Sequence, residues 1–172
     1  MQKFNLKIKK LFQEIVLALL IIFVVSNIIS YIRKPALPSE EIPTIELKTI
    51  HGQSVDMASY SGKPLIIHIW ATWCPTCRME NSNIEQISSK YNVLTIAVKS
   101  GSNEKLQKYM TENKFSFLVV NDSNGDLASK LNIEVFPTTL IYDSEHKLKF
   151  IETGYTTTAG LLARMAYLNN VD

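Results

Sequence analysis

The sequence is poor in the side chains that hold zinc in proteins. It contains only two cysteines, Cys74 and Cys77, and three histidines in 172 residues. A tetrahedral zinc site needs four such ligands close together. The histidines, His51, His68 and His146, are far apart in the chain and on different expected elements. We therefore expect no zinc site, and no resident metal or cofactor.

The sequence also lacks a basic stripe with interleaved aromatic side chains, the pattern typical of nucleic-acid-binding proteins. Its formal net charge is +2, but six of its 18 basic residues lie within the first 34 positions. From Glu41 onward, 12 basic residues accompany 14 acidic ones, a net charge of about −2. Nucleic acid is therefore not an expected partner. We find neither an internal repeat nor a low-complexity segment.

The N-terminal residues 1–34 differ in character from the rest of the chain. An apolar run of 18 residues, 15–32, is broken only by three polar side chains, and two more apolar residues precede it at 11 and 12. A membrane-spanning helix needs roughly 20 apolar residues. We therefore predict a transmembrane helix over about 11–32, followed by a polar, proline-containing linker over 35–40.

The basic residues around this run predict its orientation. Four lysines precede it, whereas one arginine and one lysine follow it. Positive residues collect on the cytoplasmic side of a membrane. We expect a single-pass protein of the inner membrane, with its domain facing the periplasm or the cell exterior. A cleaved signal peptide is the alternative, but the run is long and no A-x-A-like site follows it.

From residue 41 the pattern predicts one globular domain, 41–172. The run 65–70 is almost continuously apolar, as in a central strand covered on both faces. Other segments predict strands at 44–50, 55–59, 93–98, 115–120, 138–142 and 147–153, and helices at 74–90, 103–113, 126–131 and 157–168. This order predicts an α/β fold, a mixed central sheet with helices on both faces.

The two cysteines stand two residues apart where the central strand passes into a helix. The N–H groups and dipole at a helix N-terminus favour a thiolate at Cys74, the expected attacking nucleophile. Pro75 has no N–H to donate, but that donor has no partner so early in a helix. Cys77, one turn further, is expected to be less exposed and to act as the resolving thiol.

A structural disulfide and a copper(I) site are the two alternative uses of these thiols. A purely structural disulfide would close a very small loop and stabilise little, because the entropic gain increases with loop length. Copper(I) can bind two thiolates, so a copper(I) chaperone remains an alternative. The spacing favours reversible dithiol/disulfide chemistry.

The segment 70–78, WATWCPTCR, resembles the active-site segment of thioredoxin-fold proteins, especially the membrane-tethered extracytoplasmic group typified by TlpA, ResA and ScsD. The resemblance covers roughly residues 41–170. Similar residues in that group correspond to 62–64, 137–139 and 154–156. The resemblance implies a thioredoxin fold in which Pro137 follows a cis peptide bond and lies against the cysteine pair.

A cis proline at that place leaves nearby main-chain groups available to pair with an extended substrate. Phe136, Pro137 and Thr138 are therefore the expected docking edge. The residues around the nucleophile, Trp73, Pro75 and Thr76, are expected to complete the substrate surface.

Two further residues are candidates for proton transfer. Glu80 matches an acidic position near the site in the TlpA and ResA group and is a possible base; a solvated helix carboxylate is the alternative. His68 stands six residues before Cys74, where thioredoxin has a buried acid. It is either a proton acceptor for Cys77 or a hydrogen-bonded core histidine.

These observations predict a thiol:disulfide oxidoreductase that acts on thiols and disulfides of extracytoplasmic proteins. The resemblance favours a reductant reloaded by a membrane redox donor. It suggests apocytochrome c thiols, copper-handling proteins or oxidised cysteines as substrates. The residues do not fix the direction of electron flow, so an oxidant served by a membrane acceptor remains an alternative.

Overall fold

The structure is a computed structural model that describes residues 2–32, 35–37, 39 and 47–171. The chain divides into two units, Met1–Lys34 and Pro35–Asp172. The expected domain start at residue 41 lies outside the described residues, as does part of the expected linker 35–40. The elements are α1 Gln2–Ile32, β1 Leu47–Lys48, β2 Ser54–Val55, the 3-10 helix η1 Met57–Tyr60, β3 Leu65–Trp70, α2 Pro75–Ser88, β4 Asn92–Val98, α3 Asn103–Asn113, β5 Leu118–Asp122, α4 Asp126–Lys130, β6 Thr138–Tyr142, β7 Leu148–Thr153 and α5 Thr158–Val171.

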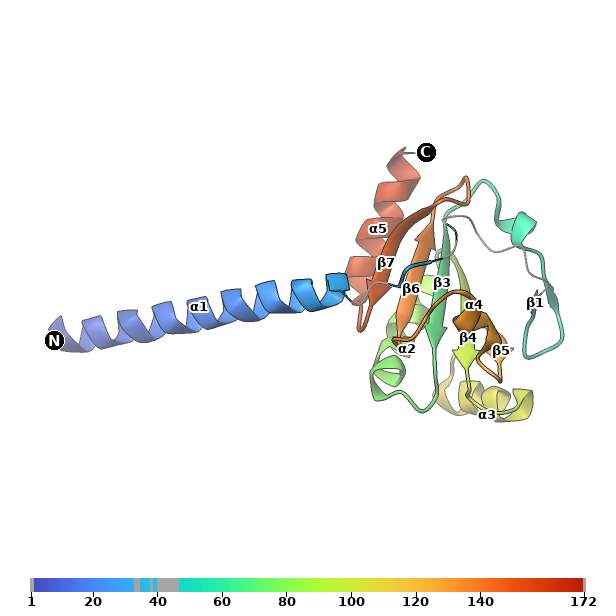
Figure 1. Ribbon diagram of the computed structural model, residues 1–172, viewed down its shortest axis with the longest axis horizontal. Coiled ribbons are helices and arrows are strands. Elements are labelled where there is room, and N and C mark those ends of the chain that lie inside the picture. The colour runs from blue at the N-terminus through green and yellow to red at the C-terminus, as the bar shows by residue number, and fades with distance from the viewer. Residues whose placement is uncertain (1, 33–34, 38, 40–46, 172) are drawn as a thin grey trace. The chain divides into compact units, whose positions relative to one another are not determined.

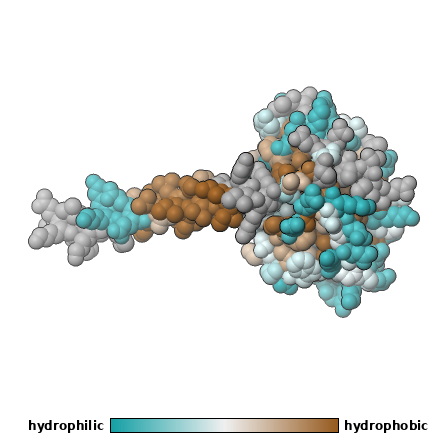
Figure 2. Space-filling view, in the orientation of Figure 1, coloured by the Kyte–Doolittle hydropathy of each residue, from teal (hydrophilic) through white to brown (hydrophobic). Residues whose placement is uncertain are grey.

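The first unit is one continuous helix, α1. Its large apolar side chains between Phe12 and Ile29 are exposed wherever they are described. Figure 2 shows them as a hydrophobic band, with hydrophilic side chains toward the N-terminal end. Within the described part of the chain, no helix has the combined length and hydropathy that crossing a membrane requires. The anchor over about 11–32 stays a prediction.

The second unit contains a five-stranded mixed sheet in the order β5-β4-β3-β6-β7 (Figure 1). Strands β5, β4 and β3 are parallel, whereas β6 is antiparallel to both β3 and β7. All six residues of β3 are buried, because side chains from both faces of the sheet cover this central strand. The predicted α/β class, mixed sheet and central strand 65–70 are confirmed.

Two cores lie on opposite faces of the sheet. One face packs against α2, α3 and α5, which contribute Ile84, Leu106 and Leu161 among others. The other face packs against η1 and α4, which contribute Met57 and Ala128. This arrangement places the N-terminus of α2 at the carboxyl end of β3, where a βα connection presents functional groups.

Two predicted strands were wrong in part. The strand over 55–59 ends at Val55 and gives way to η1, which places Met57 in the core. The strand over 115–120 is displaced to β5, because the main-chain amides of Ser116 and Phe117 bind the Glu85 carboxylate of α2. An amide that donates to a side chain is not available for the sheet ladder.

Candidate active site

The two cysteines lie at the first turn of α2 and are free thiols. Cys74 is the N-cap residue, and the main-chain amide of Cys77 donates to its Sγ at 3.3 Å. Pro75 is the first helical residue, where its missing N–H leaves no helix bond unmade. Cys74 is 7% exposed and Cys77 is fully buried, so an incoming sulfur reaches Cys74 first.

Burial also separates the two thiols chemically. Burial raises the pKa of the Cys77 thiol, and the hydrogen bond with Cys74 and the charge of Glu80 raise it further. Cys77 therefore stays protonated until a base takes its proton. The structure thus combines an accessible sulfur with a buried one that needs a proton acceptor.

The segment before β6 lies directly against Cys74. The peptide bond between Phe136 and Pro137 is cis, as the resemblance implied. The Cys74 thiol donates to the Phe136 carbonyl at 3.7 Å, and the Pro137 carbonyl accepts from the Gly154 amide at 2.8 Å. Thr138 is 1% exposed and donates its hydroxyl to the Val135 carbonyl. Thr138 therefore offers no side chain to a substrate, and any docking role falls to its main chain.

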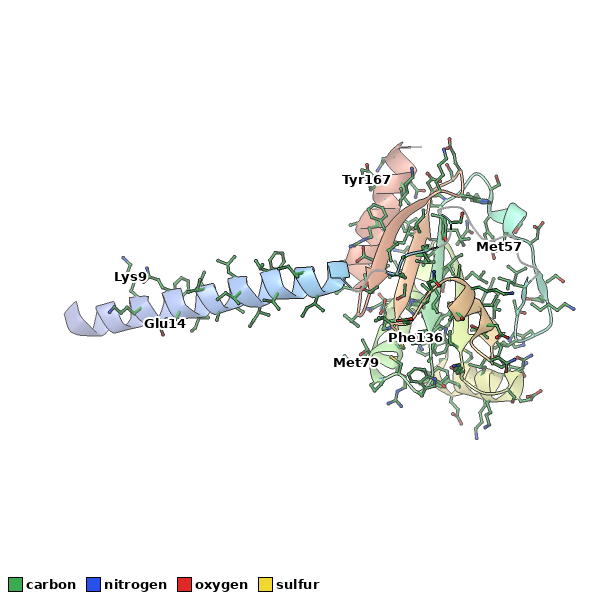
Figure 3. The ribbon with its side chains drawn as sticks, viewed as in Figure 1. Lys9, Glu14, Met57, Met79, Phe136 and Tyr167 are labelled. Carbon is green, nitrogen blue, oxygen red and sulfur yellow. The ribbon has the colours of Figure 1, made fainter. Side chains whose placement is uncertain are left out.

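The surface beside Cys74 is aromatic. Trp73 is 55% exposed and packs edge to face against Phe136, with ring centroids 5.7 Å apart. Pro75 is exposed and Thr76 half-buried on the same turn. Figure 3 shows Phe136 before β6 and Met79, itself exposed, on α2. Trp73, Pro75 and Phe136 border the entrance to the dithiol, as expected of a protein-binding surface.

A groove of about 320 Å³ opens beside Trp73 and Phe136. Its remaining lining comes from the end of β4, from α4 and from the segment that follows α4: Val98, Lys99, Gly125, Ala128, Ser129, Asn132, Ile133 and Glu134. None of these lining residues was predicted from the sequence. No local motif marks these residues, because only the path from β4 through β5 to α4 brings them beside the cysteines.

Glu80 lies on α2, one turn beyond Cys77, and its side chain is completely buried. The solvated carboxylate considered as an alternative is therefore wrong. Neither carboxylate oxygen has a hydrogen-bond partner of standard geometry among the described residues. The pKa of Glu80 is raised to about 8, chiefly by burial; the Thr156 amide opposes this rise, and the charge of Glu152 adds to it by less than that amide subtracts. Glu80 is thus poised to gain or lose a proton near neutral pH.

His68 is buried in β3, and its Nδ1 lies 2.9 Å from the Thr139 hydroxyl. Its Nε2 has no hydrogen-bond partner among the described residues. Burial lowers the pKa of His68 to about 3, so the ring is neutral at physiological pH. These features match the core-histidine alternative better than the proton acceptor.

Within the described residues, no cluster of three or more His, Cys, Asp or Glu side chains is placed to hold a metal ion. The polar groups that act on the dithiol are the Glu80 carboxyl and the main-chain amide of Cys77. They are suited to proton transfer and to stabilising charge on sulfur.

A dithiol at the head of α2, facing a cis proline on a thioredoxin fold, defines a class of protein: the protein-disulfide oxidoreductases. The comparisons agree with this class. The chain belongs to the AhpC/TSA family, whose family model matches residues 38–151.

Curated relatives carry names of the same class. A thioredoxin-like protein of Haemophilus influenzae is 32% identical over 164 residues, covering 94% of this chain and 97% of the relative. The thiol-disulfide oxidoreductase ResA of Halalkalibacterium halodurans is 26% identical and covers 73% of each chain. Among solved structures, a secreted thiol-disulfide isomerase of Corynebacterium glutamicum superimposes with a TM-score of 0.69. It is 21% identical, and the match covers 77% of this chain and 93% of that one, which supports the fold alone.

Proposed function

We propose that this protein exchanges its Cys74–Cys77 dithiol and disulfide with cysteines of extracytoplasmic proteins and acts as a reductant; an oxidant of the same fold is the alternative. One observation carries the proposal: Cys74 Sγ accepts the Cys77 amide at 3.3 Å and lies 3.7 Å from the Phe136 carbonyl, beside the cis Pro137. A substrate strand that lies along this segment brings its own sulfur to Cys74.

The reducing reaction has two steps. The Cys74 thiolate attacks a substrate disulfide, forms a mixed disulfide and expels one substrate sulfur as a thiolate. Cys77 then loses its proton and attacks the Cys74 sulfur, which releases the second substrate thiolate and closes the Cys74–Cys77 disulfide. Two electrons pass from the protein dithiol to the substrate.

Glu80 is the base that we assign to the second step. It lies on the same helix face as Cys77, is completely buried and has a pKa of about 8. The ionised carboxylate accepts the Cys77 proton and is protonated by it. His68, with a pKa of about 3, would bind that proton far more weakly.

The remaining site residues form the substrate surface. Trp73, Pro75 and Thr76 border the nucleophile, and Phe136 and Pro137 supply the docking edge, with the main chain of Thr138. The exposed Trp73 and its contact with Phe136 support this assignment.

We place the protein in the inner membrane, anchored by α1, with the domain in the periplasm or at the cell exterior. The exposed apolar side chains of α1 and the exposed Lys9 and Lys10 support this proposal. Since an oxidised dithiol must be reduced again in an oxidising compartment, a membrane redox donor is the expected second partner. The resemblance to the TlpA and ResA group favours the reducing direction, and two relatives are named thiol-disulfide oxidoreductase ResA and thiol:disulfide interchange protein DsbE.

The dithiol roles can be tested on the full chain with a model protein disulfide. Cys74→Ser should abolish reduction, and Cys77→Ser should accumulate a mixed disulfide at Cys74. Full activity of Cys74→Ser would contradict the proposal. Alkylation of intact cells checks direction and topology together: a mainly reduced pair supports the reductant, a mainly oxidised pair the oxidant. Thiols that an impermeant label cannot reach would argue against the outward domain.

The copper(I) chaperone built on the same thiols remains the alternative function. No third ligand is gathered beside the thiols in the described part of the chain. Stoichiometric copper(I) retention without turnover of disulfide substrates would favour the chaperone.

A further inference from the structure

The buried face of α2 that carries Glu80 packs on the segment after β7. Asn83, three residues beyond Glu80 and on the same side of the helix, donates from Nδ2 to the Thr156 carbonyl at 2.9 Å. Asn83 also donates to the Tyr155 hydroxyl at 3.1 Å and accepts from the Thr158 hydroxyl at 3.1 Å. These bonds hold the α2 face that carries Glu80 against the segment after β7. Glu152 lies near the end of β7, on the sheet face that α2 and α5 cover, and its charge raises the pKa of Glu80.

Glu152 is held in a well-defined ion pair. Arg164 of α5 donates from both Nε and Nη2 to the same oxygen of Glu152, each at 2.7 Å. The third guanidinium nitrogen donates to the Gly160 carbonyl at 2.8 Å, and the guanidinium lies 5.8 Å from the Phe150 ring centroid. Glu152 is only 24% exposed and Arg164 only 29%. Solvent therefore screens the pair less than an ordinary surface ion pair.

Few other charges compete with this pair around Glu80. Burial disfavours the charged forms of Cys77, His68 and Tyr109. Arg78 is exposed, on the opposite side of α2 from the core. The titratable or charged groups on the elements packed around Glu80 are Cys74, Cys77, Arg78 and Glu85 on α2, His68 on β3, Glu104, Lys105, Lys108, Tyr109 and Glu112 on α3, Lys149 and Glu152 on β7, Tyr155 after β7, and Arg164 and Tyr167 on α5.

We infer that Glu152 and Arg164 are positioning residues for the resolving step: Glu152 holds the proton on Glu80, and Arg164 limits how strongly it does so. The inference rests on the proposed function, since it concerns the base of that reaction. Both residues act through Glu80. The hydrogen bonds and ion pair described for them are with each other and with Gly160, not with a cysteine. A carboxylate beside a buried carboxyl disfavours its ionisation, and a cation that neutralises this carboxylate weakens the effect.

The pair thereby sets the pH at which Cys77 becomes active. The ionised Glu80 takes the Cys77 proton, the Cys77 thiolate attacks Cys74, and the thiol bound to Cys74 leaves with the electron pair of the broken S–S bond. When the concentration of ionised Glu80 rises, so does the rate of this release. Removing Glu152 should favour ionisation at lower pH, and removing the Arg164 charge should delay it to higher pH.

The test follows the resolving step alone in the full chain. The Cys74 thiolate attacks dithiobis(nitrobenzoate), expels a first thionitrobenzoate and keeps the second in a mixed disulfide. Cys77 then displaces this second coloured thiolate, and the rate of its release is measured against pH. We expect Glu152→Gln to move the rise in rate to lower pH and Arg164→Gln to move it to higher pH, each by about half a unit or more. In a Glu80→Gln background, neither substitution should move the profile.

Lys149→Gln is the matched control. It removes the cation of another ion pair on β7, Lys149–Asp143 at 2.8 Å, and should leave the profile in place. Shifts in the same direction for Glu152→Gln and Arg164→Gln, no shift in either, or shifts that persist without Glu80 would overturn the inference. If Arg164→Gln does not fold, the inference is tested by the pH profile of Glu152→Gln in the wild-type background and in the Glu80→Gln background. Failure of the proposed function looks different, because wild type would then release no second equivalent of thiol.

Discussion

Two neighbouring rows of side chains cross the sheet and point to opposite faces. One row, on the face covered by α2, α3 and α5, consists of Thr95, His68, Thr139 and Glu152 in register on four strands. The adjacent row, on the other face, consists of Leu94, Ile67, Leu140 and Ile151. The rows differ by one position along each strand. The first is polar on these four strands and continues on β5 with Val119, whereas the second is apolar on all five strands, with Leu118 on β5.

The apolar row contributes to core packing, whereas the polar row contributes to the surroundings of the reactive side chains. The apolar row packs into the core beneath η1 and α4, against which Phe136 of the docking edge also packs. The polar row lies beneath the helix that carries Cys77 and Glu80, and it includes the buried His68. Because successive side chains of a strand alternate between faces, one sheet can support both environments. Stability changes should therefore be uniform with pH along the apolar row and depend on pH where the polar row carries a titratable side chain.

The largest expected effect is on the pH dependence of stability at His68. Its pKa of about 3 when folded lies below the ordinary 6.5, so the folded protein binds fewer protons than the unfolded chain between these values. Stability is therefore lost as pH falls from 6.5 toward 3, by about 1.4 kcal/mol for each unit of pKa difference. His68→Asn keeps a partner for Thr139 and cannot titrate. We expect it to flatten this loss.

Urea unfolding followed by tryptophan fluorescence measures this effect, since both tryptophans, Trp70 and Trp73, belong to the second unit. Ile67→Val, on the apolar row, is the control and should cost about 1 kcal/mol equally at neutral and acid pH. If the free energy of unfolding of His68→Asn fell with pH as steeply as that of wild type, another group would be responsible for the loss at acid pH.

The next effect concerns the apolar row alone. Leu140 is fully buried in β6, so Leu140→Ala should lower the free energy of unfolding by about 3 kcal/mol through lost burial and the cavity left behind. Disulfide exchange per folded molecule should be unchanged, with the same pH profile. Urea unfolding and the exchange assay check the two parts separately. A displaced pH profile would show that the two faces are coupled.

Much of the fold was predictable because its signals are local. The unbroken apolar run of β3 predicted a central strand, and the periodic apolar residues of α3 predicted that helix to the residue. The displaced strand β5 was not predictable in the same way. Its bounds depend on Glu85, 31 residues earlier, which binds the Ser116 amide at 2.8 Å. No window of sequence around Ser116 contains that contact.

The site residues also differ in whether a local sequence signal identifies them. The sequence motif alone located Cys74, Cys77 and Pro75, since their spacing carries the chemistry. The burial of Glu80 and the Glu152–Arg164 pair depend on how α5 returns against α2, which brings together residues some 70 positions apart. A lone glutamate on a helix gives no local sign of whether it will be buried.

The smallest expected effect is within the polar row, at Thr95. The buried indole of Trp70 donates from Nε1 to the Thr95 hydroxyl at 3.1 Å. Thr95→Val keeps the shape but leaves that N–H without an acceptor, which should cost about 1–2 kcal/mol at every pH. Thr95→Ser retains the hydroxyl and should keep the indole bond. Urea unfolding of the two variants separates the hydrogen bond from the packing of the methyl group. Thr95→Val is also compared with His68→Asn. If Thr95→Val were as stable as wild type and His68→Asn reduced the loss of stability at acid pH, His68 would be the one residue of the polar row that affects stability.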